Sequence, residues 1–159
     1  MNEYGTLHES EGRYILRFER FFPQSSEDVF HVITNPSSFT QWYPFATEEM
    51  DIRLGGKIAF DDGEGTTYEG TITELAQPYL FGFQEVDDSI RISLQEEDKG
   101  CRMIFTHTFD DDSWAVNTAA GWHRCLDVLV QIVNENPVEW HDNSAKLRKA
   151  YGKAFNMEG

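Results

Sequence analysis

Residues 47–109 constrain the fold most strongly, because short runs of alternating apolar and polar residues fill this segment almost completely. The runs are separated by sequences typical of turns, at 55–56, 61–65, 77–78, 87–88 and 98–100. Each of these turns joins two runs that are long enough to form a strand. The pattern predicts about six short antiparallel strands connected as a meander.

The apolar members of these runs recur at every second position, which places them on one face of the predicted sheet. The clearest sets are Ile58/Phe60, Tyr68/Gly70/Ile72, Ile90/Ile92/Leu94 and Cys101/Met103/Phe105/His107/Phe109. The residues between them are polar and would face water. Another layer of structure must therefore cover the apolar face.

Residues 114–136 supply that layer, because their apolar side chains repeat with the period of a helix. The stripe consists of Ala119, Trp122, Leu126, Leu129, Val130 and Val133. Gly121 lies within it, where glycine costs about 1 kcal/mol relative to alanine. We therefore expect a close approach of helix and sheet at Gly121, or room for a ligand beside Trp122. Arg124 and Asp127 are predicted to pair on the solvent-facing side.

The flanking segments complete an α+β domain that spans residues 1–159, with its core in about 14–136. Residues 14–22 alternate as one further strand, which gives six to seven strands in all. A helix begins after Ser25 or Ser26, and a second short helix follows at 37–42. Residues 1–12 lack periodicity and are expected to form a loose arm. In the extension at 137–159, apolar residues at helical spacing predict a helix docked on the body.

The charge balance excludes several classes of partner. The 159 residues include 28 acidic and 13 basic side chains, for a formal charge of −15, which repels nucleic acid and anionic membrane surfaces. We expect no membrane-spanning helix and no secretory signal, since the sequence contains no run of about 20 apolar residues and residues 1–11 are polar. Cys101 and Cys125 show no metal or redox spacing and are expected to be buried thiols in a reducing, cytoplasmic compartment.

Aromatic residues make up 14% of the chain, so rings must build much of the interior. So many rings are hard to pack without voids, and ligand sites are mostly apolar with a few polar groups. The predicted lining of such a cavity is Trp42, Tyr43, Phe45, Phe60, Tyr68, Phe81, Phe83, Phe105, His107, Trp122 and Leu126. Each of these residues can equally be ordinary core.

Several motifs in this order resemble one known family. They are 16–20 (LRFER), 42–44 (WYP), 51–57 (DIRLGGK), 68–72 (YEGTI) and 119–126 (AAGWHRCL). Together they are similar to the activator-of-heat-shock-protein-90-ATPase-homologue family, within the START and birch-pollen-allergen-like (SRPBCC) superfamily. The resemblance covers about residues 14–136. It implies a helix-grip fold, in which a curved antiparallel sheet wraps a long C-terminal helix around an elongated apolar cavity. It implies no particular reaction.

Three functions remain open at this stage. The first is non-enzymatic binding of a small apolar or amphipathic, lipid-like molecule by a monomer or weak homodimer. The second is a chaperone-cofactor or other protein-interaction module, although the separate chaperone-binding domain of the eukaryotic co-chaperone has no counterpart here. The third is a cavity enzyme of cyclase or hydrolase type that uses His107 and His123 as an acid/base pair. The alternative to such a pair is that His107 is an interior residue whose hydrogen bonds are satisfied and that His123 is exposed.

No metal ion or cofactor is expected. The acidic runs at 61–64 and 110–112 do not follow a calcium-loop pattern and are explained by a turn and a helix start. The size of the interior space distinguishes the first two functions. An apolar cavity of about 300 Å³ or more favours ligand binding, whereas a fully packed interior favours protein interaction.

Overall fold

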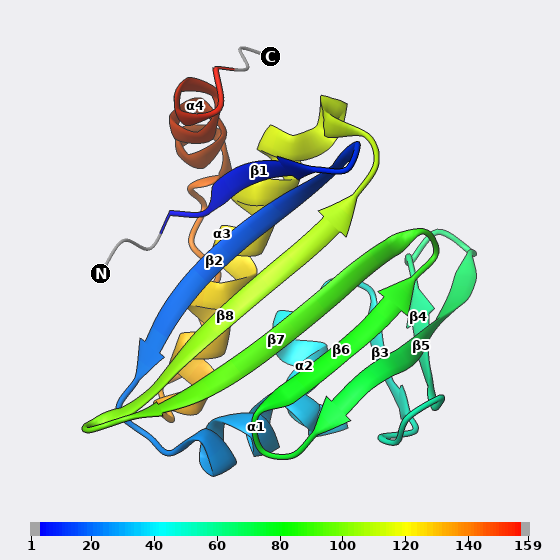
Figure 1. Ribbon diagram of the computed structural model, residues 1–159, viewed down its shortest axis with the longest axis vertical. Coiled ribbons are helices and arrows are strands. Elements are labelled where there is room, and N and C mark those ends of the chain that lie inside the picture. Colours follow the sequence, from blue (N-terminus) through cyan, green and yellow to red (C-terminus); the bar gives the residue numbers. More distant parts are fainter. Residues whose placement is uncertain (1–3, 157–159) are drawn as a thin grey trace.

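A computed structural model describes residues 4–156 and shows a broad antiparallel sheet wrapped over one long helix (Figure 1). The elements in chain order are β1 (Thr6–Ser10), β2 (Arg13–Phe22), α1 (Ser26–Thr34), α2 (Pro36–Trp42), β3 (Ala46–Met50), β4 (Lys57–Asp61), β5 (Thr67–Ala76), β6 (Leu80–Glu85), β7 (Asp88–Glu97), β8 (Gly100–Phe109), a 3-10 turn (Asp112–Trp114), α3 (Ala115–Val133) and α4 (Ser144–Ala154). This is the predicted helix-grip arrangement.

The sheet has the order β1-β2-β8-β7-β6-β5-β4-β3, and every neighbouring pair is antiparallel. Strands β3 to β8 form the meander expected for residues 47–109. The N-terminal β2 instead pairs with the last strand, so that Phe18 lies opposite Phe105. The first long strand and the last strand of the sheet therefore lie side by side.

The sheet has eight strands rather than six to seven, because part of the expected N-terminal arm is a strand. β1 pairs with β2 through residues such as Leu7 opposite Leu16. Leu7 is half-buried and the other side chains of β1 are exposed. Backbone pairing, which leaves no hydrophobic period in the sequence, holds this edge strand. Residues 1–3 of the expected arm lie outside the described residues.

The core lies between the sheet and its helices, where the alternation predicted it. On β8 the buried residues are Cys101, Met103, Phe105, His107 and Phe109. Leu126 and Leu129 of α3 have no exposed surface, so the helix packs its apolar stripe directly on this face. Burial of such side chains contributes on the order of 2 kcal/mol each to stability.

Gly121 corrects one expectation. It is exposed, and an added methyl group would meet no atom within 4 Å. Neither a close approach of helix and sheet nor space beside the Trp122 ring explains this glycine. Its position on the outer surface of α3 places it away from both.

The helices α1 and α2 cover the part of the sheet that α3 leaves open (Figure 1). The side chain of Ser25 accepts a hydrogen bond from the Asp28 amide and begins α1. Asn35 then accepts one from Ser37 N–H and begins α2, with Pro36 in its first turn. These caps are the sequence signals that place Trp42 and Tyr43 over the sheet.

The helix α4 docks against α3 through Leu147 and Tyr151, both buried. The Tyr151 hydroxyl accepts a hydrogen bond of 2.9 Å from Gly5 N–H and lies 2.8 Å from His123 Nδ1. His123 is therefore buried, at 5% exposure, and the expectation that it is exposed is wrong. The helix α4 covers His123, and the sequence of α3 alone does not predict this cover.

Arg124 and Asp127 do not form the expected solvent-facing pair. Asp127 Oδ1 lies 3.5 Å from Arg20 Nη2 of β2. Arg124 donates to the His141 carbonyl and lies over the Trp140 ring, 5.6 Å from its centroid. Asp127 is held by the strand β2 and Arg124 by the segment that follows α3, so the two side chains do not pair with each other.

Candidate functional site

Tyr43 is the centre of a continuous aromatic cluster between α2, α3 and the sheet. Its ring centroid lies 4.7 Å from that of Phe39, in a stacked arrangement, and 5.2 Å from that of Trp122. Trp122 in turn lies 4.8 Å from Phe105 of β8. The cluster comprises Phe39, Trp42, Tyr43, Phe60, Tyr68, Phe81, Phe83, Phe105 and Trp122.

These rings fill the interior. Trp42, Phe60 and Phe105 have no exposed surface, and Leu126 beside them has none either. A side chain with no accessible surface borders no void that admits water. Trp42, Phe105 and Leu126 are thus packed against their neighbours rather than around an open space.

Phe45 lies outside this cluster, so the expectation that it faces the interior is wrong. It is 52% exposed and adopts a backbone φ of 64°. It follows Pro44 in the short connection from α2 to β3 and turns the chain there. Tyr68, another predicted lining residue, is half-buried at the border of the cluster.

Two tyrosines hold one carboxylate at the border of the cluster. The Tyr43 hydroxyl donates to Glu85 Oε2 at 2.6 Å, and the Tyr68 hydroxyl donates to Glu85 Oε1 at 2.8 Å. Burial, together with the charge of Glu85 and these hydrogen bonds, raises the pKa of both phenols above the usual range. Both hydroxyls consequently remain protonated donors at neutral pH.

A second polar group starts from Trp122. Its indole Nε1–H donates to His107 Nδ1 at 2.9 Å, and His107 Nε2 lies 2.9 Å from Asp88 Oδ2. Because an indole N–H can only donate, Nδ1 must be the unprotonated nitrogen, so Nε2 carries the hydrogen and donates to Asp88. His107 is 8% exposed and is a satisfied interior residue.

His107 and His123 do not form the hypothesised acid/base pair. His107 points from β8 to Trp122 and Asp88, whereas His123 is held by Tyr151 of α4. Consecutive positions on α3 direct Trp122 and His123 to different surfaces. The two imidazoles therefore belong to separate parts of the core.

A pocket of about 290 Å³ opens beside the second polar group, at the start of α3. Its walls include His107 and Asp88, the buried ring of Phe109 and the 64%-exposed ring of Trp114. The remaining lining residues are Asp87, Asp110, Asp111 and Thr118. Through the Trp122–His107 hydrogen bond this pocket adjoins the aromatic cluster.

Glu85 and Asp88 were missed as site residues although the sequence contains a signal for both. Glu85 continues the inward phase of Phe81 and Phe83 on β6, and Asp88 continues that of Ile90 on β7. A carboxylate on the apolar face of a strand requires a partner. Those partners, Tyr43, Tyr68 and His107, come from other elements and only the fold identifies them.

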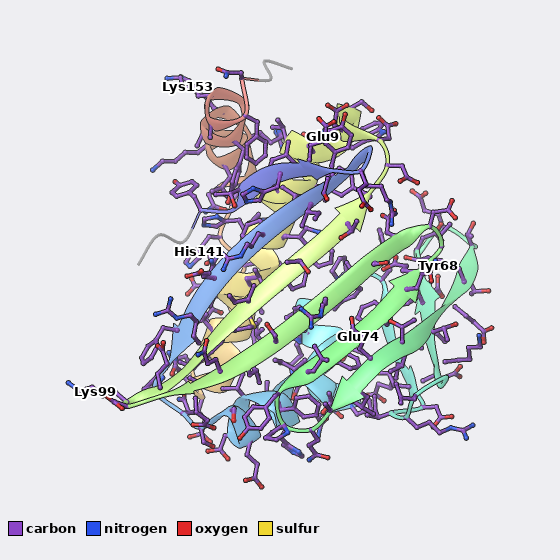
Figure 2. The ribbon with its side chains drawn as sticks, in the orientation of Figure 1. Glu9, Tyr68, Glu74, Lys99, His141 and Lys153 are labelled. Carbon is purple, nitrogen blue, oxygen red and sulfur yellow. The ribbon has the colours of Figure 1, made fainter. Side chains whose placement is uncertain are left out.

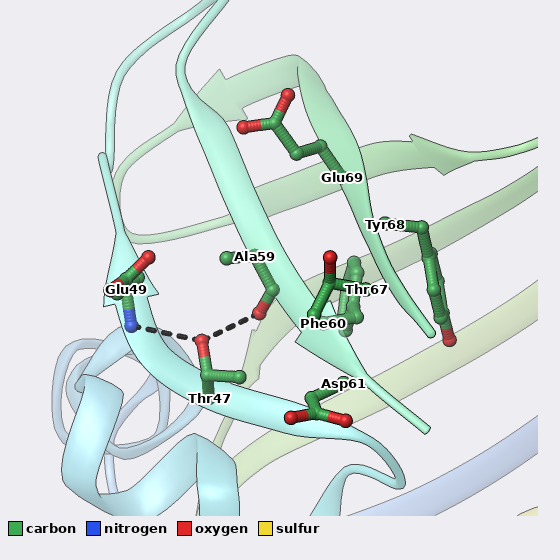
Figure 3. A pocket seen from close by; sticks show the side chains of 8 residues that line it. All are labelled: Thr47, Glu49, Ala59, Phe60, Asp61, Thr67, Tyr68 and Glu69. Atoms are coloured by element: carbon green, nitrogen blue, oxygen red, sulfur yellow. Dashed lines mark hydrogen bonds between the residues drawn. The ribbon is translucent and has the colours of Figure 1, made fainter. Parts of the chain in front are cut away.

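A larger groove of about 630 Å³ crosses the outer face of β3, β4 and β5 (Figure 3). Three carboxylates, Glu49, Asp61 and Glu69, face it. Thr47 Oγ1 donates to the Ala59 carbonyl at 2.7 Å and accepts from Glu49 N–H at 3.2 Å across its floor. The groove is lined by Thr47, Glu49, Ala59, Phe60, Asp61, Thr67, Tyr68 and Glu69.

Within residues 4–156, no three His, Cys, Asp or Glu side chains are grouped as metal ligands. Cys101 and Cys125 are free and buried. Burial raises the pKa of the Cys125 thiol to about 12 and that of Cys101 to about 11. No helix in the described part of the chain is long and apolar enough to cross a membrane.

In this chain a curved antiparallel sheet holds a long helix, and two short helices, α1 and α2, follow the strand β2. This arrangement defines a helix-grip domain. The sequence profile described as "Activator of Hsp90 ATPase homolog 1-like protein" matches residues 23–134, well over half of the chain. The chain belongs to this family.

Solved structures share the fold at low sequence identity. A conserved protein of unknown function from Enterococcus faecalis superposes with a TM-score of 0.81 at 18% identity, covering 98% of this chain and 92% of that one. CalU16 from Micromonospora echinospora superposes at 0.73 with 17% identity, over 98% and 95% of the two chains. No curated protein matches the sequence. At these identities the likeness establishes the fold alone.

Proposed function

We propose that the protein binds a small apolar or amphipathic molecule inside the helix grip, between the sheet and α3. The supporting observation is an aromatic interior with polar groups at one border. Tyr43 and Tyr68 converge on Glu85, and Trp122 reaches Asp88 through His107. Apolar surroundings with a few placed hydrogen-bonding groups are the usual composition of a ligand site.

Because the rings fill the interior, the ligand must displace a side chain. Tyr43 is the residue best placed to move. It is the C-terminal cap of α2, its ring touches Phe39 and Trp122, and its hydroxyl bonds to Glu85. The connection that follows it carries the exposed Phe45. Outward rotation of Tyr43 would open a path between α2 and α3 to the cluster.

Binding is tested by native mass spectrometry of freshly purified protein and by thermal shift with a library of fatty acids and aromatic acids. We expect bound mass or a reproducible stabilisation by one chemical group of compounds. Tyr43→Ala, which removes the ring that fills the path, should strengthen binding several-fold. Tyr79→Ala, a half-exposed ring outside the cluster, is the matched control and should leave affinity unchanged.

An empty native chain with no thermal shift, combined with an equally empty Tyr43→Ala variant, would contradict this function. The variant is needed because a native chain that is closed by Tyr43 can fail to bind for kinetic reasons alone. Its folded state is verified by near-ultraviolet circular dichroism before the screen.

The packed interior favours a second function, a protein-interaction or chaperone-cofactor module. The cluster rings Trp42 and Phe60 are fully buried. The measurement is saturable stimulation of a heat-shock-protein-90-type ATPase by added protein, together with its capture on the immobilised chaperone. Absence of both effects would remove this candidate.

We further propose that the protein is not an enzyme. The lone pair of His107 Nδ1 already accepts from Trp122, and the Nε2–H is donated to Asp88, so this imidazole has no free nitrogen for a substrate proton. His107→Ala should therefore lower the melting temperature by breaking two hydrogen bonds. Turnover of a bound compound that is lost in this variant at unchanged melting temperature would establish catalysis instead.

A further inference from the structure

The distribution of charge on this chain is strongly uneven. α4 has the sequence SAKLRKAYGKA and contains four of the thirteen basic residues and no acidic one. Lys146, Arg148, Lys149 and Lys153 are all exposed. Within residues 4–156 none of them forms an ion pair. Leu147 and Tyr151 anchor the helix on the body, so this basic surface is held in a fixed orientation.

The groove on β3, β4 and β5 has the opposite character. Glu49, Asp61 and Glu69 face it from three neighbouring strands, and no basic residue lines it (Figure 3). These three carboxylates make no ion pair with any residue that the structure describes. The groove is therefore an acidic hollow that lacks a cation of its own.

The two surfaces match in spacing as well as in sign. Lys146, Lys149 and Lys153 follow the i, i+3, i+7 pattern of one helix face, where neighbouring side chains are about 5–6 Å apart. Carboxylates on adjacent strands are separated by about 4.8 Å between strand axes. A helix laid across the groove would bring successive lysines to successive strands.

The two surfaces cannot meet within one chain. Lys153 on α4 and Tyr68 beside the groove lie at opposite sides of the molecule (Figure 2). We propose that α4 of one copy docks into the acidic groove of a second copy, in a head-to-tail contact between two different surfaces. Such a heterologous contact forms closed rings or open chains rather than a two-fold dimer.

Net charge and local charge act in opposite directions on this contact. Two copies with a formal charge of −15 repel each other, but at about 0.15 M salt the Debye length is about 8 Å, so distant charges are screened. Charges that meet in the groove are closer than that length. Association is therefore weak, strongest near moderate ionic strength, and lost at about 1 M salt, where the Debye length is about 3 Å.

A charge-swap experiment tests the contact by sedimentation equilibrium over a concentration series. The helix variant is Lys149→Glu with Lys153→Glu, and the groove variant is Glu49→Lys with Glu69→Lys. Each variant alone opposes like charges and should associate at least tenfold more weakly than the native chain. An equimolar mixture pairs the acidic helix of one with the basic groove of the other, and should regain the native association.

The matched control is Glu9→Lys with Glu27→Lys, which changes the net charge as the groove variant does but lies outside the groove. It should associate as tightly as the native chain or more tightly. A monomeric native chain, a mixture that stays monomeric, or a control that is weakened like the groove variant would each overturn the proposal. Melting temperatures close to native verify that the surface substitutions leave the fold intact.

Discussion

A methyl group added at Gly121 meets no atom within 4 Å, and the surrounding residues of α3 are helical. Alanine at this exposed position removes the conformational freedom of glycine in the unfolded chain without introducing a clash. We therefore expect Gly121→Ala to raise the free energy of unfolding by about 0.5–1 kcal/mol. Urea denaturation followed by circular dichroism at 222 nm measures this change.

The control for this substitution is Gly70→Ala on β5. There the added methyl group would lie 3.0 Å from the Phe60 ring and 3.1 Å from the Gln84 carbonyl, so the variant should lose stability. A loss of stability in Gly121→Ala as well would contradict the open position of this residue on the outer surface of α3.

Single residues mark the limit of what the sequence predicts. The inward phase of the strands located Phe60, Phe105 and His107 correctly, because alternation along a strand is a local property. Phe45 and His123 were misplaced, because their exposure depends on a turn with positive φ and on the docking of α4. These are tertiary features that no local period encodes.

At the scale of elements, Tyr151 connects three of them. Tyr151 lies on α4. Its hydroxyl accepts a hydrogen bond from Gly5 N–H, just ahead of β1, and contacts His123 of α3. Tyr151→Phe leaves the buried Gly5 amide without this acceptor, so we expect a loss of about 1–3 kcal/mol in the free energy of unfolding. Hydrogen exchange at the amides of β1 should accelerate more than exchange in the meander.

Tyr79→Phe serves as the control for that variant, since Tyr79 lies half-exposed on the turn between β5 and β6. Its exchange rates in β1 should equal those of the native chain. Uniform acceleration throughout the sheet of Tyr151→Phe would contradict a local role in holding β1.

Most elements were predictable because their determinants are short-range. The cap at Ser25 located α1, and the apolar period located α3. β1 was not predictable, because it pairs only through its backbone and carries no apolar alternation. The groove on β3 to β5 was missed for a related reason: its acidic residues are the ordinary outward residues of three strands.

At the scale of the whole molecule, buried tyrosine phenols and a buried cysteine thiol determine how stability falls at alkaline pH. Burial raises the pKa of Tyr151 and of Cys125 to about 12, and it raises the pKa of Tyr43 and Tyr68 as well. In the unfolded chain a thiol loses its proton near pH 8.5 and a phenol near pH 10, both on the order of their unperturbed values. The folded chain therefore holds more protons than the unfolded chain above these pH values, and its stability decreases as pH rises.

We expect the free energy of unfolding to be constant with respect to these groups below about pH 7.5 and to fall steadily from about pH 8.5 to pH 12. Urea titrations at stepped pH measure the slope. Tyr68→Phe removes one of the groups and should show a shallower decline than the native chain between about pH 10 and pH 12. An identical slope in both chains would show that the Tyr68 phenol does not contribute.

The order of the strands also sets the timing of folding during synthesis. Strands β3 to β8 pair with neighbours in the sequence, so each can form as it leaves the ribosome. β2 can at first pair only with β1, because its second partner, β8, lies far along the chain: Phe18 and the opposite Phe105 are 87 positions apart. At about 5–20 residues per second, Leu16, Phe18 and Phe22 remain without their partners on β8 for about 4–17 s after they are made. The nascent N-terminal strand is thus the segment most exposed to aggregation or to capture by a chaperone.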